Sequence, residues 1–329
     1  MRVLACLLLA LLACAAGPAR ADARPAWAAD ARSVVVPVRE ASGGLERMDV
    51  HWFLPRGAGP GPFPVMLFSH GRDPSAARRA GLAFGIGRAQ LQFWLSRGVA
   101  VVVPVRPGYG AHAGADLEDD GLRVDDAGRC VGRADFDRST LTALHALDAT
   151  LRWLRVQPWA DAGHVMLVGQ SVGGMVSVAA GSYSPPGVVG VVNFAGGTGG
   201  NAEHAPGSSC SPGLVEALFA GYGRTTTVPS LWIYALDDQY WGAVAPREWH
   251  AAFARGGSRT TFVQAPAPAD GDGHGLSRHS PALWGAAVDE FLARLGAPWD
   301  ASTAPRPVLR LDAGGACIDT GAATCTSPR

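Results

Sequence analysis

One segment of the chain combines a serine with closely spaced glycines, and it reads Gly169-Gln170-Ser171-Val172-Gly173. An apolar run precedes the segment, and a stretch with helical composition follows it. A serine at this spacing between a strand and a helix is typical of a sharply turned nucleophile. The turn strains the backbone, and it presents the hydroxyl at the carboxyl edge of a sheet, above a helix N-terminus. We therefore expect Ser171 to be a nucleophile, although a tight turn without a catalytic role would show the same spacing.

A serine hydroxyl needs a base to accept its proton, and the base needs a carboxylate to orient it. His274 lies in a glycine-rich loop near the end of the chain and is the predicted base, with His279 as the alternative. Two adjacent carboxylates, Asp237 and Asp238, follow an apolar run at 229–235. From the residues alone, either aspartate could be the acid of a Ser-Asp-His triad.

The negative charge that develops on a substrate oxygen requires two backbone amides, which together form an oxyanion hole. The amide of Val172, directly after the nucleophile, is one candidate. The other is the amide of Arg72, because it follows the apolar run at 64–69 and the pair His70-Gly71. We expect the ring of His70 to hold this loop by hydrogen bonds rather than to transfer protons.

Alternating strands and helices must position these residues. Strand composition recurs at 33–39, 47–54, 64–69, 98–105, 164–168, 187–194, 229–235 and 260–263. Helical segments are expected at 88–96, at 139–156 with Ser139 as the N-cap, and at 281–295. Unbroken apolar strands alternating with helices predict an α/β fold with a doubly wound, mostly parallel sheet flanked by helices. We expect one catalytic domain at 33–296.

The composition excludes two classes of protein. The chain has 329 residues, of which 48% are hydrophobic, and 28 basic residues balance 28 acidic ones. This hydrophobic content excludes an intrinsically disordered chain. The zero net charge and scattered arginines argue against a nucleic-acid partner, because they form no basic stripe that would neutralise phosphates.

The N-terminal segment 1–21 has the order of a secretory signal peptide, with Arg2, an apolar run at 3–16 and small residues before the cleavage site. Cleavage is expected after Ala21, with Ala23 as the alternative. A short lead-in at 22–32 follows, and no later stretch is long and apolar enough to form a transmembrane segment. We expect an exported protein, periplasmic or secreted. The alternative is lipid anchoring through Cys14, whose preceding residues are similar to a lipoprotein signal.

Four cysteines remain after the signal peptide, and an even number in an oxidising compartment predicts two disulfides. Cys317 and Cys325 enclose a short stretch of the C-terminal tail, 297–329, so we expect them to pair with each other. That leaves Cys130 to pair with Cys210. A zinc site is the alternative, but the cysteines and histidines lack ligand spacing, so no metal and no cofactor are expected.

Taken together, these motifs resemble an α/β-hydrolase of the dienelactone-hydrolase-like branch, over Pro64 to Leu295. The residues that carry the resemblance are Ser69-His70-Gly71, Arg106-Pro107-Gly108-Tyr109-Gly110, Gly169-Gln170-Ser171-Val172-Gly173-Gly174, Leu236-Asp237-Asp238 and Gly273-His274-Gly275. The resemblance implies an α/β-hydrolase fold, and it favours Asp238 as the acid because the acid of that branch closes a four-residue turn after its strand. The chain differs from the enzymes that give the branch its name, because it has Ser171 where their nucleophile is cysteine. No large cap domain is expected, because only one strand and one or two helices fit between the nucleophile and the acid.

The expected function is that of an exported serine hydrolase that cleaves carboxylic esters through an acyl-enzyme, with a small-molecule ester as its substrate. The same triad could serve a peptidase, an amidase or an acyltransferase. A hydrolase-fold protein that only binds a ligand or partner is an alternative of a different class.

Overall fold

The computed structural model describes residues 25–40, 43–269, 271–278, 281–299, 309–311 and 317–319. The predicted signal peptide, Cys14, His279 and Cys325 lie outside these residues, and so does the predicted tail disulfide.

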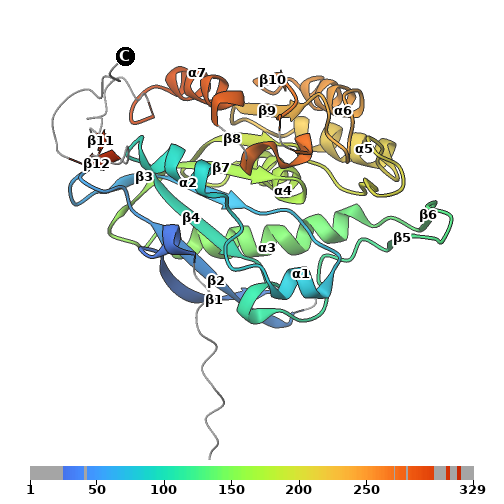
Figure 1. The fold of residues 1–329 in the computed structure, drawn as a ribbon, viewed down its shortest axis with the longest axis horizontal. Helices are drawn as coiled ribbons and strands as arrows, with labels where there is room; N and C mark the ends of the chain where they lie inside the picture. The colour runs from blue at the N-terminus through green and yellow to red at the C-terminus, as the bar shows by residue number, and fades with distance from the viewer. Residues whose placement is uncertain are drawn as a thin grey trace, which may run out of the picture.

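An eight-stranded sheet forms the centre of the molecule, in the order β1-β2-β4-β3-β7-β8-β9-β10 (Figure 1). Its strands are β1 (Arg32–Arg39), β2 (Leu45–Phe53), β3 (Phe63–Ser69), β4 (Ala100–Val105), β7 (Ala160–Gln170), β8 (Val188–Phe194), β9 (Ser230–Ala235) and β10 (Thr260–Ala265). Only β2 pairs antiparallel with its neighbours β1 and β4, and all other pairs are parallel. The predicted mostly parallel sheet is therefore confirmed.

Helices cover both faces of this sheet, which explains its continuous apolar strands. The α-helices are α1 (Ala76–Ala80), α2 (Arg88–Leu95), α3 (Phe136–Leu154), α4 (Val172–Ser182), α5 (Pro212–Gly223), α6 (Ala245–Ala254) and α7 (Gly285–Leu295). Short 3₁₀ turns are η1 (Ala26–Ala28), η2 (Gly110–His112), η3 (Gly273–Arg278) and η4 (Pro281–Leu283). One hydrophobic core packs α3, α4, α5 and α6 against the sheet, and a second packs α2 and α7 against it.

Helix α3 begins earlier than the sequence predicts, and Ser139 is not its N-cap. Asp135 caps the helix, and its carboxylate accepts a hydrogen bond from the Arg138 amide at 3.0 Å. Ser139 is buried inside the first turns, where its hydroxyl donates to the Phe136 carbonyl. The prediction of Ser139 was wrong because the carboxylate one turn earlier already satisfies the free amides at the helix start.

A small hairpin, β5 (Leu122–Val124) and β6 (Cys130–Gly132), extends from the sheet region before α3 (Figure 1). This hairpin is not predicted from the amino-acid sequence. Cys130 of this hairpin is bonded to Cys210, which precedes α5, so the predicted pairing of these two cysteines is confirmed. The remaining elements are β11 (Leu309–Leu311) and β12 (Cys317–Asp319), which pair with each other. In the described ranges, none of the helices has both the length and the apolar character needed to cross a bilayer.

Replacing both bonded cysteines, Cys130→Ser with Cys210→Ser, is expected to lower the free energy of unfolding. The bond joins residues 80 positions apart, so it restricts the unfolded chain over a long loop. Disulfides of this kind stabilise by typically about 2–4 kcal/mol. Urea unfolding of both proteins in non-reducing buffer measures the difference, and equal midpoints would contradict the expectation.

Candidate active site

The backbone turns sharply at Ser171, which lies between β7 and α4. Its φ of 58° and ψ of −129° fall in a region that residues other than glycine rarely adopt. The neighbouring segments come so close that a Cβ at Gly169 would lie 2.0 Å from the Gly173 carbonyl oxygen, and one at Gly173 would lie 2.0 Å from the Ser69 carbonyl oxygen. Glycine is required at both positions, which explains the spacing seen in the sequence.

His274 lies in η3 and pairs with a carboxylate from the end of β9. Its Nδ1 is 3.2 Å from both carboxylate oxygens of Asp238. Asp238 is 1% exposed, and its Oδ1 accepts hydrogen bonds from the amides of Tyr240 at 2.8 Å and Trp241 at 3.1 Å. These contacts hold the carboxylate in place beside the imidazole ring.

The adjacent Asp237 takes a different position. Its Oδ1 is buried without a hydrogen-bond partner among the described residues. That oxygen lies against Gly273, where a Cβ would approach it to 2.3 Å. Of the two candidate acids, the structure brings Asp238 to His274.

Further contacts fix His274 in ways that the sequence analysis did not predict. The ring of Tyr240 stacks on the imidazole at a centroid distance of 4.0 Å, and Trp241 meets it edge-on at 5.2 Å. Gln170 donates a hydrogen bond to the His274 carbonyl at 2.9 Å, and Asp272 accepts one from the His274 amide at 2.8 Å. In the sequence, the only sign of a role for Gln170 is its position next to Ser171. Its hydrogen bond to His274, which is distant in the chain, cannot be predicted from the sequence.

Ser171 and His274 open into the same cavity, which has a volume of about 530 Å³. The other lining residues are His70, Gly71, Arg72, Asp73, Arg78, Leu82, Gly85, Tyr109, Gln170, Tyr240, Gly271, Asp272, Gly275 and Arg278. No hydrogen bond joins Ser171 to His274 in the part of the chain that the structure describes. Catalytic hydrogen bonds of this type often tighten only when substrate is bound.

The two predicted oxyanion amides come from segments next to the nucleophile. Val172 is the first residue of α4, so its amide has no partner within the helix. Arg72 lines the cavity and follows Gly71, where a Cβ would lie 3.2 Å from the Cβ of Ser171. The backbone of this loop therefore lies directly against Ser171.

His70 holds this loop, as the sequence analysis predicted. Its Nε2 accepts a hydrogen bond from the Arg106 amide at 3.1 Å, and its Nδ1 lies 2.8 Å from the Gly71 carbonyl oxygen. Burial and the nearby Arg106 charge lower the pKa of His70 well below its ordinary value. The ring is thus neutral, with its proton on Nδ1, and it serves as a structural link.

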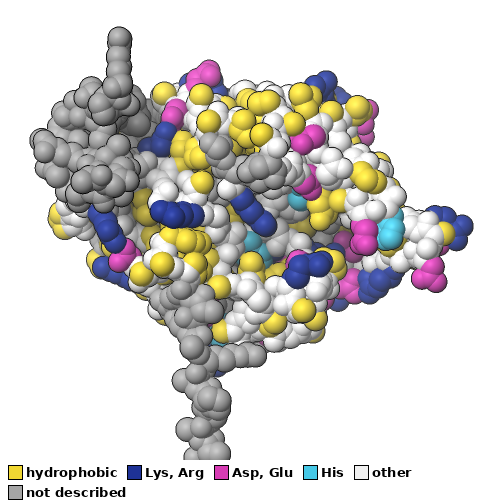
Figure 2. Space-filling view, viewed as in Figure 1, with side chains coloured by type: hydrophobic (Ala, Val, Ile, Leu, Met, Phe, Trp, Pro, Cys, Tyr) yellow, Lys and Arg dark blue, Asp and Glu magenta, His cyan; other side chains and the backbone are white. Residues whose placement is uncertain are grey.

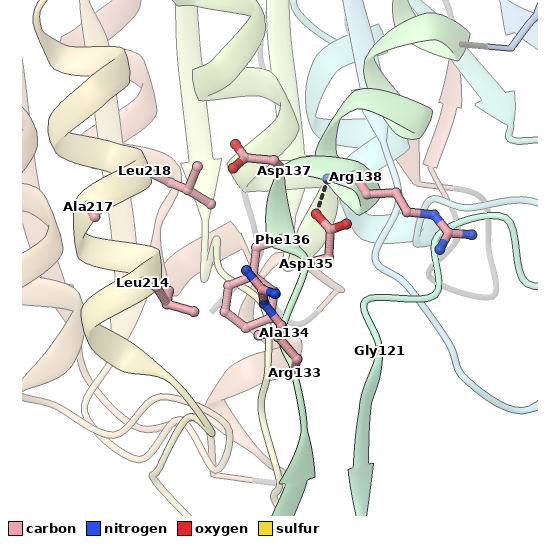
Figure 3. A pocket seen from close by; sticks show the side chains of 10 residues that line it. All are labelled: Gly121, Arg133, Ala134, Asp135, Phe136, Asp137, Arg138, Leu214, Ala217 and Leu218. Carbon is pink, nitrogen blue, oxygen red and sulfur yellow. Dashed lines mark hydrogen bonds between the residues drawn. The ribbon is translucent and has the colours of Figure 1, made fainter. Parts of the chain in front are cut away.

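A second, larger cavity of about 780 Å³ lies between the start of α3 and helix α5 (Figure 3). Asp135, Arg138 and Leu214 are among its lining residues, and none of the predicted catalytic residues lines it.

Within the described ranges, no cluster of three or more His, Cys, Asp or Glu side chains is arranged to hold a metal ion. On the face shown in Figure 2, basic and acidic side chains are interspersed.

The strained turn leads to a prediction about stability. Ser171→Gly is expected to unfold at a higher temperature than Ser171→Ala, because glycine adopts the positive φ of this position without the steric cost of a Cβ. Strain of this kind amounts to about 1–3 kcal/mol. Thermal unfolding of the two variants, both of which lack the hydroxyl, measures the difference directly. Equal unfolding temperatures would show that the turn stores no strain.

Comparison with known proteins gives matches in structure only. No protein-family model and no curated protein matches the chain. The acylaminoacyl peptidase of Pyrococcus horikoshii aligns with a TM-score of 0.53 and 16% identity, over 80% of this chain and 41% of that protein. Est1E from Butyrivibrio proteoclasticus aligns with a TM-score of 0.50 and 14% identity, over 80% of this chain and 98% of that protein. An esterase from Pyrococcus furiosus aligns with the same TM-score and identity, over 80% of this chain and 91% of that protein.

These matches bear on the fold of the chain. The aligned region covers about two fifths of the peptidase, whereas it covers almost all of each esterase. By name these neighbours are a peptidase and two esterases, and this chain aligns with them over 80% of its length. The sheet topology, the sharp turn at Ser171 and these structural neighbours together show that the chain has the α/β-hydrolase fold.

Proposed function

We propose that this protein is a serine hydrolase that cleaves carboxylic esters through an acyl-enzyme intermediate. The observation that carries the proposal is the pairing of His274 with Asp238 at the edge of the cavity into which Ser171 opens. A nucleophile, a base and an orienting carboxylate are the groups that acyl transfer requires.

We assign each group a step in this reaction. The contact of Nδ1 with Asp238 leaves Nε2 of His274 as the atom that accepts the Ser171 proton when the hydroxyl attacks the ester carbonyl. The amides of Arg72 and Val172 stabilise the negative oxygen of the tetrahedral intermediate. The intermediate collapses, His274 gives its proton to the departing alcohol, and the acyl group remains on Ser171. Water, deprotonated by His274, then attacks the acyl-enzyme, the acid leaves, and His274 returns its proton to the Ser171 oxygen.

The walls of the cavity favour short or polar esters. Charged residues at 72–78 and 272–278 line it, and among the lining residues that the structure describes Leu82 is the one with an aliphatic side chain. A long acyl chain would strip water from these charges without gaining apolar contacts. The neighbours named above include a peptidase as well as esterases, so amide hydrolysis is the second candidate chemistry.

The same proposal includes export from the cell. The bond between Cys130 and Cys210 supports it, because disulfides persist mainly in oxidising compartments. The mass of the mature protein purified from its native host tests this point, since cleavage after residue 21 removes a defined N-terminal segment.

A fluorophosphonate probe tests the nucleophile. The probe phosphonylates serines that a neighbouring base activates, so we expect one adduct per chain, on Ser171. Intact mass and peptide mapping locate the adduct, with Ser171→Ala as the control that should not react. A folded wild-type protein without an adduct would favour the alternative of a protein that only binds a ligand. An adduct combined with faster turnover of amides than of matched esters would move the substrate class to amides.

The two aspartates form a matched pair for testing the acid. Asp238→Asn is expected to lower kcat by about 10³- to 10⁴-fold, because the amide no longer holds the imidazole in the required tautomer. Asp237→Asn removes an equal charge one residue away and should change kcat by only a few fold. Hydrolysis of a short-chain p-nitrophenyl ester provides the rates. The reverse ranking would assign the acid role to Asp237.

A further inference from the structure

The loop that carries the predicted oxyanion amide is bound on its far side by one buried arginine. Arg106 follows β4 and is 2% exposed. Its Nη1 donates to the His70 carbonyl at 2.6 Å and to the Ser69 hydroxyl at 3.2 Å, and its Nη2 donates to the Gly71 carbonyl at 3.2 Å. A guanidinium is a rigid planar fork of donors, so these contacts fix several consecutive loop residues relative to one another.

The Gly71 carbonyl is the decisive contact, because it belongs to the same peptide group as the Arg72 amide. Two donors hold this oxygen, Nη2 of Arg106 and the protonated Nδ1 of His70. The peptide is trans, so its N–H points away from its C=O. Holding the Gly71 oxygen toward Arg106 therefore directs the Arg72 amide to the opposite side, where the loop faces Ser171.

A buried carboxylate holds the arginine in turn. Glu118 is 1% exposed and accepts hydrogen bonds from Nε and Nη2 of Arg106 and from the hydroxyl of Tyr109. The same hydroxyl accepts a hydrogen bond from the Asp73 amide, at the end of the loop 69–73 that carries the Arg72 amide. Burying such a pair costs desolvation free energy that the mutual attraction often fails to recover. The pair is therefore weak evidence for a role in stability, and its position next to the loop favours a role in holding the loop.

We propose that Arg106, held by Glu118, is a positioning residue that aims the Arg72 amide at the developing oxyanion. The inference rests on the proposed function. Arg106 contacts the loop carbonyls and does not line the cavity, so the Arg72 amide, and not Arg106, would contact the substrate. An oxyanion donor contributes most when its direction is fixed before the reaction, because no reorganisation is then needed at the transition state.

The side chain of Arg72 supports the same arrangement. It is bound to Asp116 at 2.8 Å and to Asp120 at 3.2 Å, in the segment that also carries Glu118. The backbone before Arg72 and the side chain of Arg72 are thus both attached to the layer behind the loop. The amide between them has little freedom to turn away from the cavity.

Three variants, measured with a short-chain p-nitrophenyl ester, test the proposal. Arg106→Lys keeps the charge opposite Glu118 but offers a single nitrogen, so the loop is held less firmly. We expect kcat to fall roughly 10-fold or more, with KM nearly unchanged. This loss should be smaller than the about 10²–10³-fold loss in kcat that follows deletion of an oxyanion donor. Arg106→Met combined with Glu118→Gln removes both charges and leaves an acceptor for Tyr109. Arg97→Met is the control, because it breaks the ion pair with Asp289 between α2 and α7.

The double variant separates positioning from stability. Removing both partners avoids an unpaired buried charge, so the protein should unfold near the wild-type temperature while kcat stays low. Recovery of wild-type kcat together with wild-type stability would overturn the proposal. If the double variant does not fold, Arg106→Lys decides, and an unchanged kcat in the folded lysine variant would overturn the proposal as well. A lowered kcat in Arg97→Met would have the same consequence, because loss of an ion-paired arginine away from the site would then suffice.

Fluorophosphonate labelling distinguishes failure of this inference from failure of the proposed function. A wild-type protein that is neither labelled nor active contradicts the hydrolase itself. A wild-type protein that is labelled and active, beside Arg106 variants with unchanged kcat, contradicts only the role of Arg106.

Discussion

Three backbone segments approach one another at van der Waals distance around Ser171, and the geometry of the site depends on that approach. The turn at Ser171 holds an unfavourable conformation, so the packing on both sides must stabilise it. On one side the end of β3 lies against Gly173, and on the other Gly174 lies against the asparagine side chain of β8. Side chains larger than glycine would separate these segments, and the serine would lose its place at the edge of the sheet.

The groups around the serine are held by contacts that span the whole fold. His274 comes from a loop near the end of the described chain, yet its carbonyl is bound to Gln170 beside the nucleophile. Asp238 is fixed by the amides of the turn that follows it, so its direction is set locally. The His70 and Gly71 carbonyls of the loop before Arg72 are bound by Arg106, a residue of the neighbouring strand end. His274 and the loop before Arg72 are thus each supported by an element other than the one that carries them, whereas Asp238 is held by its own turn.

The strands and the serine turn could be predicted because their physical causes act over short distances. Strands covered on both faces appear as unbroken apolar runs, and the sharp turn requires glycine at fixed spacing. The hairpin β5–β6 was missed because its three-residue strands are mostly exposed and show no apolar pattern. The Arg106–Glu118 pair was missed because its charges look like any others in the sequence, and their burial appears only in the folded chain. Which aspartate faces His274 likewise depends on the direction of each side chain after β9.

The disulfide between the hairpin and the segment before α5 also separates residues that are synthesised early, within the closed loop, from residues that are synthesised after it. The loop closed by Cys130 and Cys210 contains β7, Ser171 and α4, whereas Asp238 and His274 lie beyond it. During synthesis from the N-terminus, every atom of that closed loop emerges before the aspartate and the histidine do. The segment with Ser171 can therefore be closed covalently before Asp238 and His274 have emerged, and the cavity at Ser171 becomes complete only when the last third of the chain docks onto the sheet.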